Sequence, residues 1–120
     1  MTDFRYPKSE KLKKKSDIDL LFKKGKWMSY GNARLIVLKN IPEQQRSRVG
    51  VSVSKKFFKK AVDRNRIKRL LREYYRLNKS VLEEQFGNAA SVMLFWVSKT
   101  MPDNLECVTK EFNNLFNSKK

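Results

Sequence analysis

The sequence predicts an α+β domain, in which helices pack on one small mixed sheet. Its 120 residues fit a single domain, and eight Phe and two Trp supply apolar volume for a core. Runs of β-branched or wholly apolar residues, each of strand length, alternate with segments of helical periodicity. The predicted order is α-β-β-α-β-α, and residues 27–31 either extend the first strand or form one of their own.

The chain opens with a basic segment and a short helix. Residues 1–15 hold six Lys and Arg against two acids, which is typical of a flexible basic arm. A helix is predicted over residues 16–24, with Ser16 as its N-cap, acids in its first turn and lysines in its last turn. Gly25 is expected to end this helix.

Two strands are predicted next, over residues 32–40 and 47–56, because both stretches are rich in β-branched residues and flanked by loop residues. The loop between them has the length of a hairpin connection. In the second strand valines alternate with small residues, which gives one buried face and one small polar face. The polar face carries Gly50, Ser52 and Ser54.

The longest predicted helix, residues 63–77, has two unlike sides and Asp63 as its expected cap. The apolar side comprises Ile67, Leu70, Leu71, Tyr74 and Leu77. The opposite side comprises Arg64, Asn65, Lys68, Arg69, Arg72 and Arg76. Arg66 falls at the border of the apolar side, so the helical wheel alone does not assign it to the basic face.

The last third of the chain predicts a helix, a strand and a helix. Residues 80–86 continue or restart the long helix, with Ser80 as a candidate cap and Gly87 as a stop. The apolar run 90–99 predicts a strand that is buried on both faces. Residues 102–116 predict an amphipathic helix, in which Cys107 packs among apolar side chains.

Charge is distributed unevenly along the chain, whose formal net charge is +16. Residues 1–76 hold 23 Lys and Arg against seven Asp and Glu, whereas residues 77–120 hold five of each. Such an excess on a small domain indicates nucleic acid or an anionic membrane surface as partner. No stretch approaches the ~20 apolar residues of a membrane span, and the N-terminus lacks a secretory signal pattern. We therefore expect a soluble cytoplasmic protein.

The residues do not predict a catalytic or metal site on the protein itself. The chain has no histidine, so Cys107 lacks the partner of a Cys–His pair. The four glycines form no phosphate-cradling loop. The first-turn position of Asp17 and Asp19 is explained by the helix dipole, and the adjacent Glu83 and Glu84 diverge on a helix.

The basic residues between positions 55 and 76 favour phosphate binding over a merely solvated helix face. A solvated face usually intersperses both signs, because like charges at i, i+4 repel. Here the i, i+4 ladder is uninterrupted and consists of Arg64, Lys68, Arg72 and Arg76. The free N–H groups at the start of this helix, beside Lys59 and Lys60, add a site for an anion.

RNA is favoured over DNA, because strands flank the basic helix, whereas helix-turn-helix and homeodomain proteins are all-helical. The small polar face of the second strand suits single-stranded nucleotides that lie against a sheet. Phe22, Phe57 and Phe58 are candidate stacking residues, and core packing is the alternative for each of them.

The stretches "RVGVSVSKK" and "KKAVDRNRIKRLLREYYR" closely resemble the bacterial ribonuclease P protein subunit. Arg64-Asn65-Arg66, followed by Lys68 and Arg69, is similar to the RNR motif of that family. The opening "LKKKSDIDLLFKKGK" matches the family's basic arm, Asp-led helix and Lys-x-Gly, so the resemblance covers nearly the whole chain.

The resemblance implies a protein that partners a large catalytic RNA, which removes 5′ leaders from precursor tRNA in a magnesium-dependent reaction. It implies a four-stranded sheet with a left-handed βαβ crossover, an RNR helix that faces the catalytic RNA, and a leader cleft between the sheet and the first helix. The expected RNA-binding residues are Arg64, Asn65, Arg66, Lys68, Arg69, Arg72, Arg76, Lys59 and Lys60. The expected leader-binding residues are Phe22, Ser52, Ser54, Lys55 and Lys56.

Three features depart from the family pattern. Ile18 stands where an aromatic residue usually follows the Asp of the opening helix, and "LIVL" stands where the first strand commonly carries an aromatic residue. Leader stacking is therefore expected to rely more on Phe22 and the lysines, or to be weaker. The segment between Lys56 and Ala61 is also slightly longer than the family pattern.

Together these features predict an accessory subunit of ribonuclease P that has no catalytic residues and binds no cofactor. The RNA of the holoenzyme requires Mg²⁺, and the protein is expected to act as a monomer within the ribonucleoprotein. One alternative is a structural, ribosomal-type RNA-binding protein without a processing role. The other is a protein-only nuclease.

Overall fold

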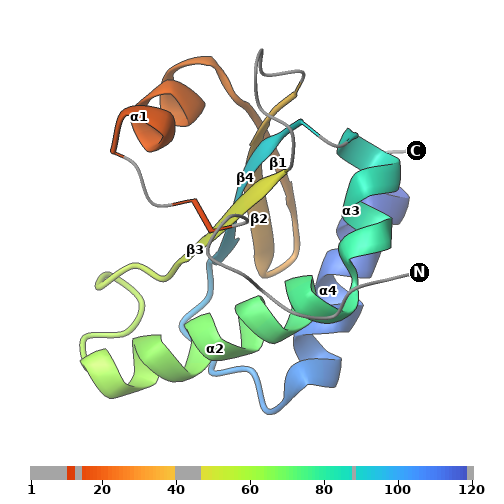
Figure 1. The fold of residues 1–120 in the computed structure, drawn as a ribbon. Coiled ribbons are helices and arrows are strands. Elements are labelled where there is room, and N and C mark those ends of the chain that lie inside the picture. Colours follow the sequence, from red (N-terminus) through yellow and green to blue (C-terminus); the bar gives the residue numbers. More distant parts are fainter. Residues whose placement is uncertain (1–10, 13–14, 40–46, 88, 119–120) are drawn as a thin grey trace.

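A mixed sheet forms the centre of the fold (Figure 1) in the computed structural model, which describes residues 11–12, 15–39, 47–87 and 89–118. In chain order the elements are α1 (Lys15–Lys24), β1 (Lys26–Tyr30), β2 (Ala33–Leu38), β3 (Arg48–Ser52), α2 (Ala61–Leu77), α3 (Lys79–Phe86), β4 (Ser91–Trp96) and α4 (Leu105–Ser118). The predicted α+β class and order are confirmed, and residues 27–30 belong to a separate strand, β1, whereas Gly31 lies in the turn that follows it.

The strands are ordered β1-β2-β4-β3, with β1–β2 and β2–β4 antiparallel and β3–β4 parallel. The loop between β2 and β3 has the length of a hairpin connection, but these strands are not neighbours, because β4 lies between them. β4 is the most apolar strand and is buried on both faces, which places it inside the sheet rather than at an edge. β1 and β2 form the hairpin instead, and α2 and α3 make the crossover from β3 to β4.

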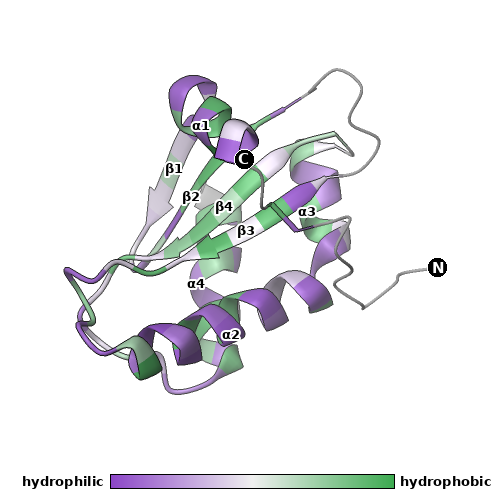
Figure 2. Cartoon of the chain, turned by 60° about the vertical axis from the view of Figure 1, so that its left-hand side comes forward, coloured by the Kyte–Doolittle hydropathy of each residue, from purple (hydrophilic) through white to green (hydrophobic). Residues whose placement is uncertain are grey.

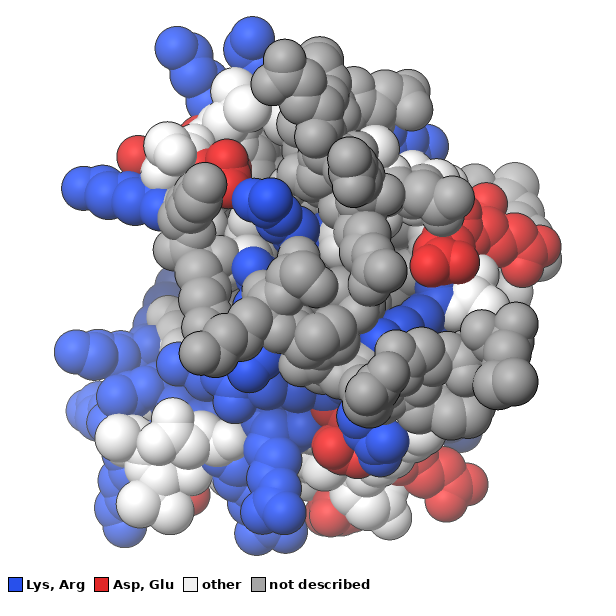
Figure 3. All heavy atoms as spheres, viewed as in Figure 1, with Lys and Arg blue, Asp and Glu red and all other residues white. Residues whose placement is uncertain are grey.

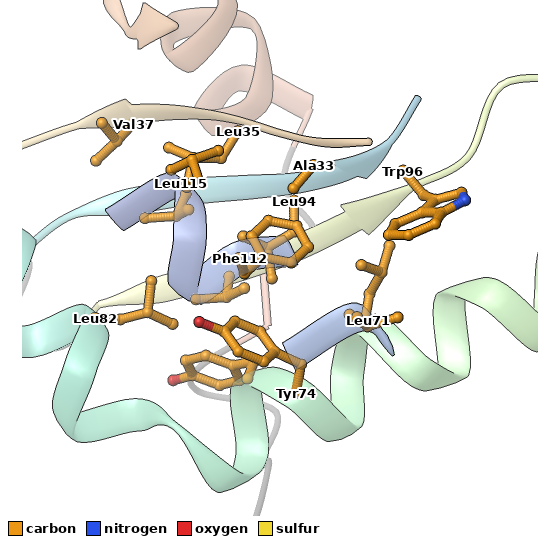
Figure 4. Packing of buried hydrophobic residues seen from close by; sticks show 14 of the residues in the cluster. Ala33, Leu35, Val37, Leu71, Tyr74, Leu82, Leu94, Trp96, Phe112 and Leu115 are labelled. Atoms are coloured by element: carbon orange, nitrogen blue, oxygen red, sulfur yellow. The ribbon is translucent and has the colours of Figure 1, made fainter. Parts of the chain in front are cut away.

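The main core lies between one face of the sheet and the helices α2, α3 and α4 (Figure 4). Trp96 and Leu94 of β4 lie against the fully buried side chains of Leu71, Tyr74 and Phe112. The rings of Tyr74 and Phe112 stack at 5.0 Å between centroids, which joins α2 to α4. Cys107 packs against this core from α4, as predicted.

A smaller core lies on the opposite face of the sheet, beneath α1. Leu21 of α1 is fully buried against Ile36 of β2 and Met93 of β4. Gly25 ends α1, as predicted, and a Cβ at this position would lie 2.7 Å from Cγ1 of Ile36. The absence of a side chain there therefore lets the chain turn directly from α1 into the sheet.

The end of the predicted basic arm is attached to β3. The Leu12 N–H donates to the Val49 carbonyl at 3.1 Å, and the Leu12 side chain is buried in the smaller core. A Cβ at Gly50 would lie 3.1 Å from Cε of Met93, which is a tight contact, and 3.4 Å from the Leu12 Cβ, which is an ordinary van der Waals distance. Lys15 already belongs to α1. The predicted arm, residues 1–15, thus extends too far toward α1. Residues 1–10 and 13–14 lie outside the described residues.

Three predicted helix caps are wrong. Ser16, Asp63 and Ser80 all lie inside helices, because α1, α2 and α3 begin at earlier residues. Asn78 separates α2 from α3: its side-chain amide donates to the Tyr74 carbonyl at 2.8 Å, and its own carbonyl accepts the Val81 N–H. These bonds satisfy groups that helix ends leave unpaired, so one asparagine closes one helix and opens the next. Gly87 ends α3, as predicted.

Candidate nucleic-acid interface

The outer side of α2 is hydrophilic, whereas its inner side is apolar (Figure 2). Ile67, Leu71 and Tyr74 are buried, as the sequence predicts, but Tyr75 is buried too and Leu77 is 41 % exposed. The buried side of α2 is therefore rotated toward Tyr75 relative to the prediction. This rotation moves Arg66 away from the buried side, and its side chain is exposed.

The predicted RNA-binding side chains of α2 fall into two groups. The exposed group consists of Asn65, Arg66, Arg69 and Arg72. Arg64, Lys68 and Arg76 are only partly exposed. Across the described residues, no ion pair involves Arg66, Arg69 or Arg72. These three arginines thus present their charge to solvent, which is the arrangement expected of a phosphate-binding surface.

Arg76 differs from these arginines, because it pairs with an acid on its own helix. Its Nη2 lies 2.8 Å from Oε2 of Glu73, and its Nε donates to Oε1 of the same carboxylate at 3.3 Å. The hydrogen bonds from Arg76 lower the pKa of Glu73 below its ordinary value. The predicted uninterrupted ladder of like charges is therefore wrong at Arg76, since Glu73 offsets part of that charge.

The first arginine of the RNR triplet also has a local partner. Nη1 of Arg64 donates to the carbonyl oxygens of Phe58 at 2.9 Å and Lys59 at 2.8 Å. Both carbonyls belong to the loop that precedes α2. The guanidinium of Arg64 therefore points back along the chain rather than along the outer side of the helix.

That loop, residues 53–60, presents four exposed lysines around a buried anchor. Phe58 is buried in the main core and Phe57 packs against it, so both are core residues rather than exposed stacking residues. The exposed side chains are Lys55, Lys56, Lys59 and Lys60. The space-filling view shows basic residues gathered over this loop and the first half of α2, whereas acidic residues appear toward α3 (Figure 3).

A second candidate surface lies on the sheet face that carries α1. Phe22 of α1, Trp27 of β1 and Phe95 of β4 form an aromatic cluster, with ring centroids 5.5 to 6.2 Å apart. Phe22 and Trp27 are 44 % and 49 % exposed. The guanidinium of Arg34 lies 5.9 Å from the Trp27 ring centroid, so a cation borders the cluster. Exposed aromatic rings beside a cation suit stacking of nucleotide bases.

The predicted leader-binding residues are brought together only in part. Ser52 is paired in register with Phe95 and lies on the same face of the sheet, next to the aromatic cluster. Ser54 instead belongs to the lysine loop, where its hydroxyl accepts the Lys56 N–H at 3.0 Å. Lys55 and Lys56 are exposed in this loop. The leader surface predicted from the sequence is thus divided between the sheet and the loop.

Trp27 and Phe95 are functional candidates that sequence reasoning missed. Phe95 lies within the apolar run of β4 and is therefore expected in the core, whereas Trp27 lies in residues 27–31, which the sequence assigns either to the first strand or to one of their own. The signal that would have found Trp27 is its polar surroundings, because Lys26 and Ser29 do not accompany a buried strand. These two rings supply aromatic surface near α1, whereas Ile18 of α1 is not aromatic.

An ion pair fixes the other end of α1. Nη1 of Arg48 in β3 donates to Oδ2 of Asp17 at 2.9 Å, and both side chains are about one-third exposed. α1 therefore crosses the sheet from Asp17, near β3, to Phe22, near β1.

Among the described residues, no helix is both long and apolar enough to cross a membrane. The same residues include no group of three or more Cys, Asp or Glu side chains that could hold a metal ion.

Residues 6–120, nearly the whole chain, match the family model of ribonuclease P. The chain belongs to the ribonuclease P protein family. Its Arg64-Asn65-Arg66 triplet lies in the first turns of α2, and of its two arginines Arg64 is the one that donates to carbonyls of the preceding loop.

The ribonuclease P protein component of Dictyoglomus thermophilum is 43 % identical over 81 residues, which cover 68 % of this chain and 65 % of that protein. The corresponding protein of Porphyromonas gingivalis is 38 % identical over 106 residues, covering 83 % of this chain and 76 % of that protein. The chain thus spans about two thirds of the length of the Dictyoglomus relative.

Solved ribonuclease P proteins share the fold. The protein from Staphylococcus aureus superposes with a TM-score of 0.74 at 25 % identity, covering 92 % of this chain and 95 % of that one. The protein from Thermotoga maritima superposes with a TM-score of 0.71 at 28 % identity, covering 91 % of this chain and 96 % of that one.

Proposed function

We propose that this chain is the protein subunit of ribonuclease P, which binds the catalytic RNA and the 5′ leader of precursor tRNA and so promotes maturation of the tRNA 5′ end. The observation that carries the proposal is the outer side of α2, where Arg66, Arg69 and Arg72 are exposed, in a chain that matches the family model over residues 6–120. Guanidinium groups bind phosphate oxygens in a bidentate manner, which suits a structured RNA backbone.

The catalytic RNA is proposed to lie along α2 and the lysine loop. Arg66, Arg69 and Arg72 bind phosphates, and Lys68, Lys59 and Lys60 extend this surface on either side. Asn65 is exposed between the arginines and supplies polar contacts. Arg76 is the weakest member of the predicted set, because Glu73 already occupies its guanidinium.

The leader is proposed to lie on the sheet face beside α1. Its bases stack on the cluster of Phe22, Trp27 and Phe95, while Arg34 and the lysines of the loop bind its phosphates. Stacking on aromatic side chains tolerates any base, which suits a leader whose sequence differs from one tRNA precursor to another. Ser52 lines this surface from β3.

Replacing Trp27 with alanine is expected to weaken binding of a leader-bearing precursor by about 5- to 150-fold, since base stacking contributes about 1–3 kcal/mol. A precursor without a leader should bind equally well to the unchanged chain and to the Trp27→Ala variant. Fluorescence anisotropy with the two precursors, in the presence of the catalytic RNA, measures this difference. Tyr30→Ala is the matched control, because Tyr30 is 46 % exposed on the same strand but lies on its opposite face. Equal losses for the two variants would exclude the cluster as the stacking site.

The proposal assigns the chemistry and its magnesium to the RNA. In this proposal the protein side chains bind and orient the two RNAs. The proposed state is one protein copy within a cytoplasmic ribonucleoprotein.

Purified protein, its cognate catalytic RNA and precursor tRNA test this function in one assay with magnesium. The protein alone should not cleave the precursor, and at low salt the protein should increase leader removal by the RNA. Cleavage by the protein alone would favour a protein-only nuclease. RNA-catalysed cleavage that does not respond to the protein would instead favour a structural RNA-binding protein.

A further inference from the structure

The loop between β3 and α2 carries four positive charges within six residues, Lys55 to Lys60, and no acid. Like charges at this density repel one another, so a free loop would spread. Its backbone is nevertheless held at both ends. At the first end, the N–H groups of Phe57 and Phe58 donate to the Ser54 carbonyl, both at 3.2 Å, and the Ser54 hydroxyl accepts the Lys56 N–H.

Arg64 holds the second end of the same loop. Its Nη1 donates to two successive carbonyls, those of Phe58 and Lys59, at 2.9 and 2.8 Å. Hydrogen bonds from a charged donor are stronger than neutral ones, and this guanidinium satisfies carbonyls that no strand or helix uses. Burial of Phe58 between the two ends anchors the loop to the main core.

We infer that Arg64 is a positioning residue: it fixes the loop, and the fixed lysines bind RNA phosphates. The inference rests on the proposed function, because it concerns the same RNA-binding surface, but it gives the first residue of the RNR triplet a different role from Arg66. Arg66 presents its charge to RNA. Arg64 instead donates hydrogen bonds from its Nη1 to the loop, whose Lys59 and Lys60 lie on the same side of α2.

Salt dependence separates the two roles. Each phosphate contact contributes about 0.7–0.9 to the slope of log K against log salt. A lost phosphate ligand therefore lowers both affinity and slope. A lost positioning residue leaves the lysines available, so the slope stays unchanged while affinity falls at every salt concentration. If the backbone of one loop residue must be ordered again when RNA binds, the affinity for RNA is expected to fall by about 5- to 30-fold.

The experiment uses the full chain and ribonuclease P RNA transcribed from the same genome. Arg64→Gln should weaken binding within that range at an unchanged slope, and the amides of Lys56, Phe57 and Phe58 should exchange hydrogen faster. Arg69→Gln is the matched control, because the same charge is removed from an exposed position of the same helix. It should lower the slope by about 0.7–0.9 and leave loop exchange unchanged.

Ser54→Ala provides a second variant in case Arg64→Gln fails to fold, as judged by circular dichroism. It removes the hydrogen bond from the Lys56 N–H to the Ser54 hydroxyl without changing charge, so affinity should fall at an unchanged slope, with faster exchange at Lys56. A slope reduction in Arg64→Gln as large as that in Arg69→Gln, with loop exchange unchanged, would overturn the inference. An unchanged slope in Arg69→Gln would overturn the proposed RNA surface on α2 instead, whatever the loop exchange shows.

Discussion

A variant carrying Arg66→Gln, Arg69→Gln and Arg72→Gln is expected to bind the catalytic RNA about 100-fold more weakly than the unchanged chain at 0.1 M salt. The slope of log K against log salt should become flatter by about two to three units, because three phosphate contacts no longer release counterions. Filter binding between about 0.05 and 0.5 M salt measures both quantities.

The helix itself should survive these three substitutions. All three side chains are exposed, and removing like charges from one side of a helix relieves repulsion between them. A control variant with Lys99→Gln and Lys110→Gln loses two exposed charges outside α2 and the lysine loop. It should bind the RNA with nearly the original slope. Similar slopes for the triple variant and the unchanged chain would show that α2 does not contact RNA phosphates.

Phe112→Ala is expected to lower the free energy of unfolding by about 3–5 kcal/mol. Phe112 is fully buried, and its ring stacks on Tyr74, so truncation leaves a cavity between α4 and α2 and removes the contact that joins them. For a domain of this size that loss is a large share of the ~5–15 kcal/mol that keeps it folded. Urea unfolding followed by circular dichroism measures the change.

Phe22→Ala makes the same chemical change at an exposed position and serves as the control for stability. Its ring is 44 % exposed and lies at the edge of the aromatic cluster, so the expected loss is below about 1 kcal/mol. Comparable losses in the two variants would contradict the assignment of the main core to the α4 side of the sheet.

The sequence predicted the elements whose periodicity is long and regular. In α4, the buried residues Val108, Phe112 and Leu115 repeat at helical spacing, and a sequence window of that length determines the buried side. β4 was predicted as doubly buried from composition alone, and the structure confirms this. The order of strands was not predictable in this way, because pairing between β3 and β4 joins residues about 40 positions apart.

The sequence predicts the members of the candidate site that are recognised by their charge. It misses the members whose position depends on how side chains pack. The exposed arginines of α2 follow from helical spacing, but the placement of Arg66 depends on burial of Tyr75 in place of Leu77. The partners of Arg64 and Arg76 depend on where a flexible side chain bends, which spacing does not specify. Trp27 and Phe95 come together only through the register of three strands.

The separation of the two cores has a consequence for the order in which the molecule opens. The core beneath α1 contains only a few buried side chains, among them Leu12, Leu21, Ile36 and Met93, whereas the other holds most of the large buried residues. Parts of a protein with little buried apolar surface open at a lower free-energy cost than the whole. α1 and the attached Leu12 segment are therefore a separate opening unit, whose amides exchange before those of α2 and β4. A leader that contacts both Phe22 of α1 and Trp27 of β1 would hold α1 against the sheet and so oppose this opening.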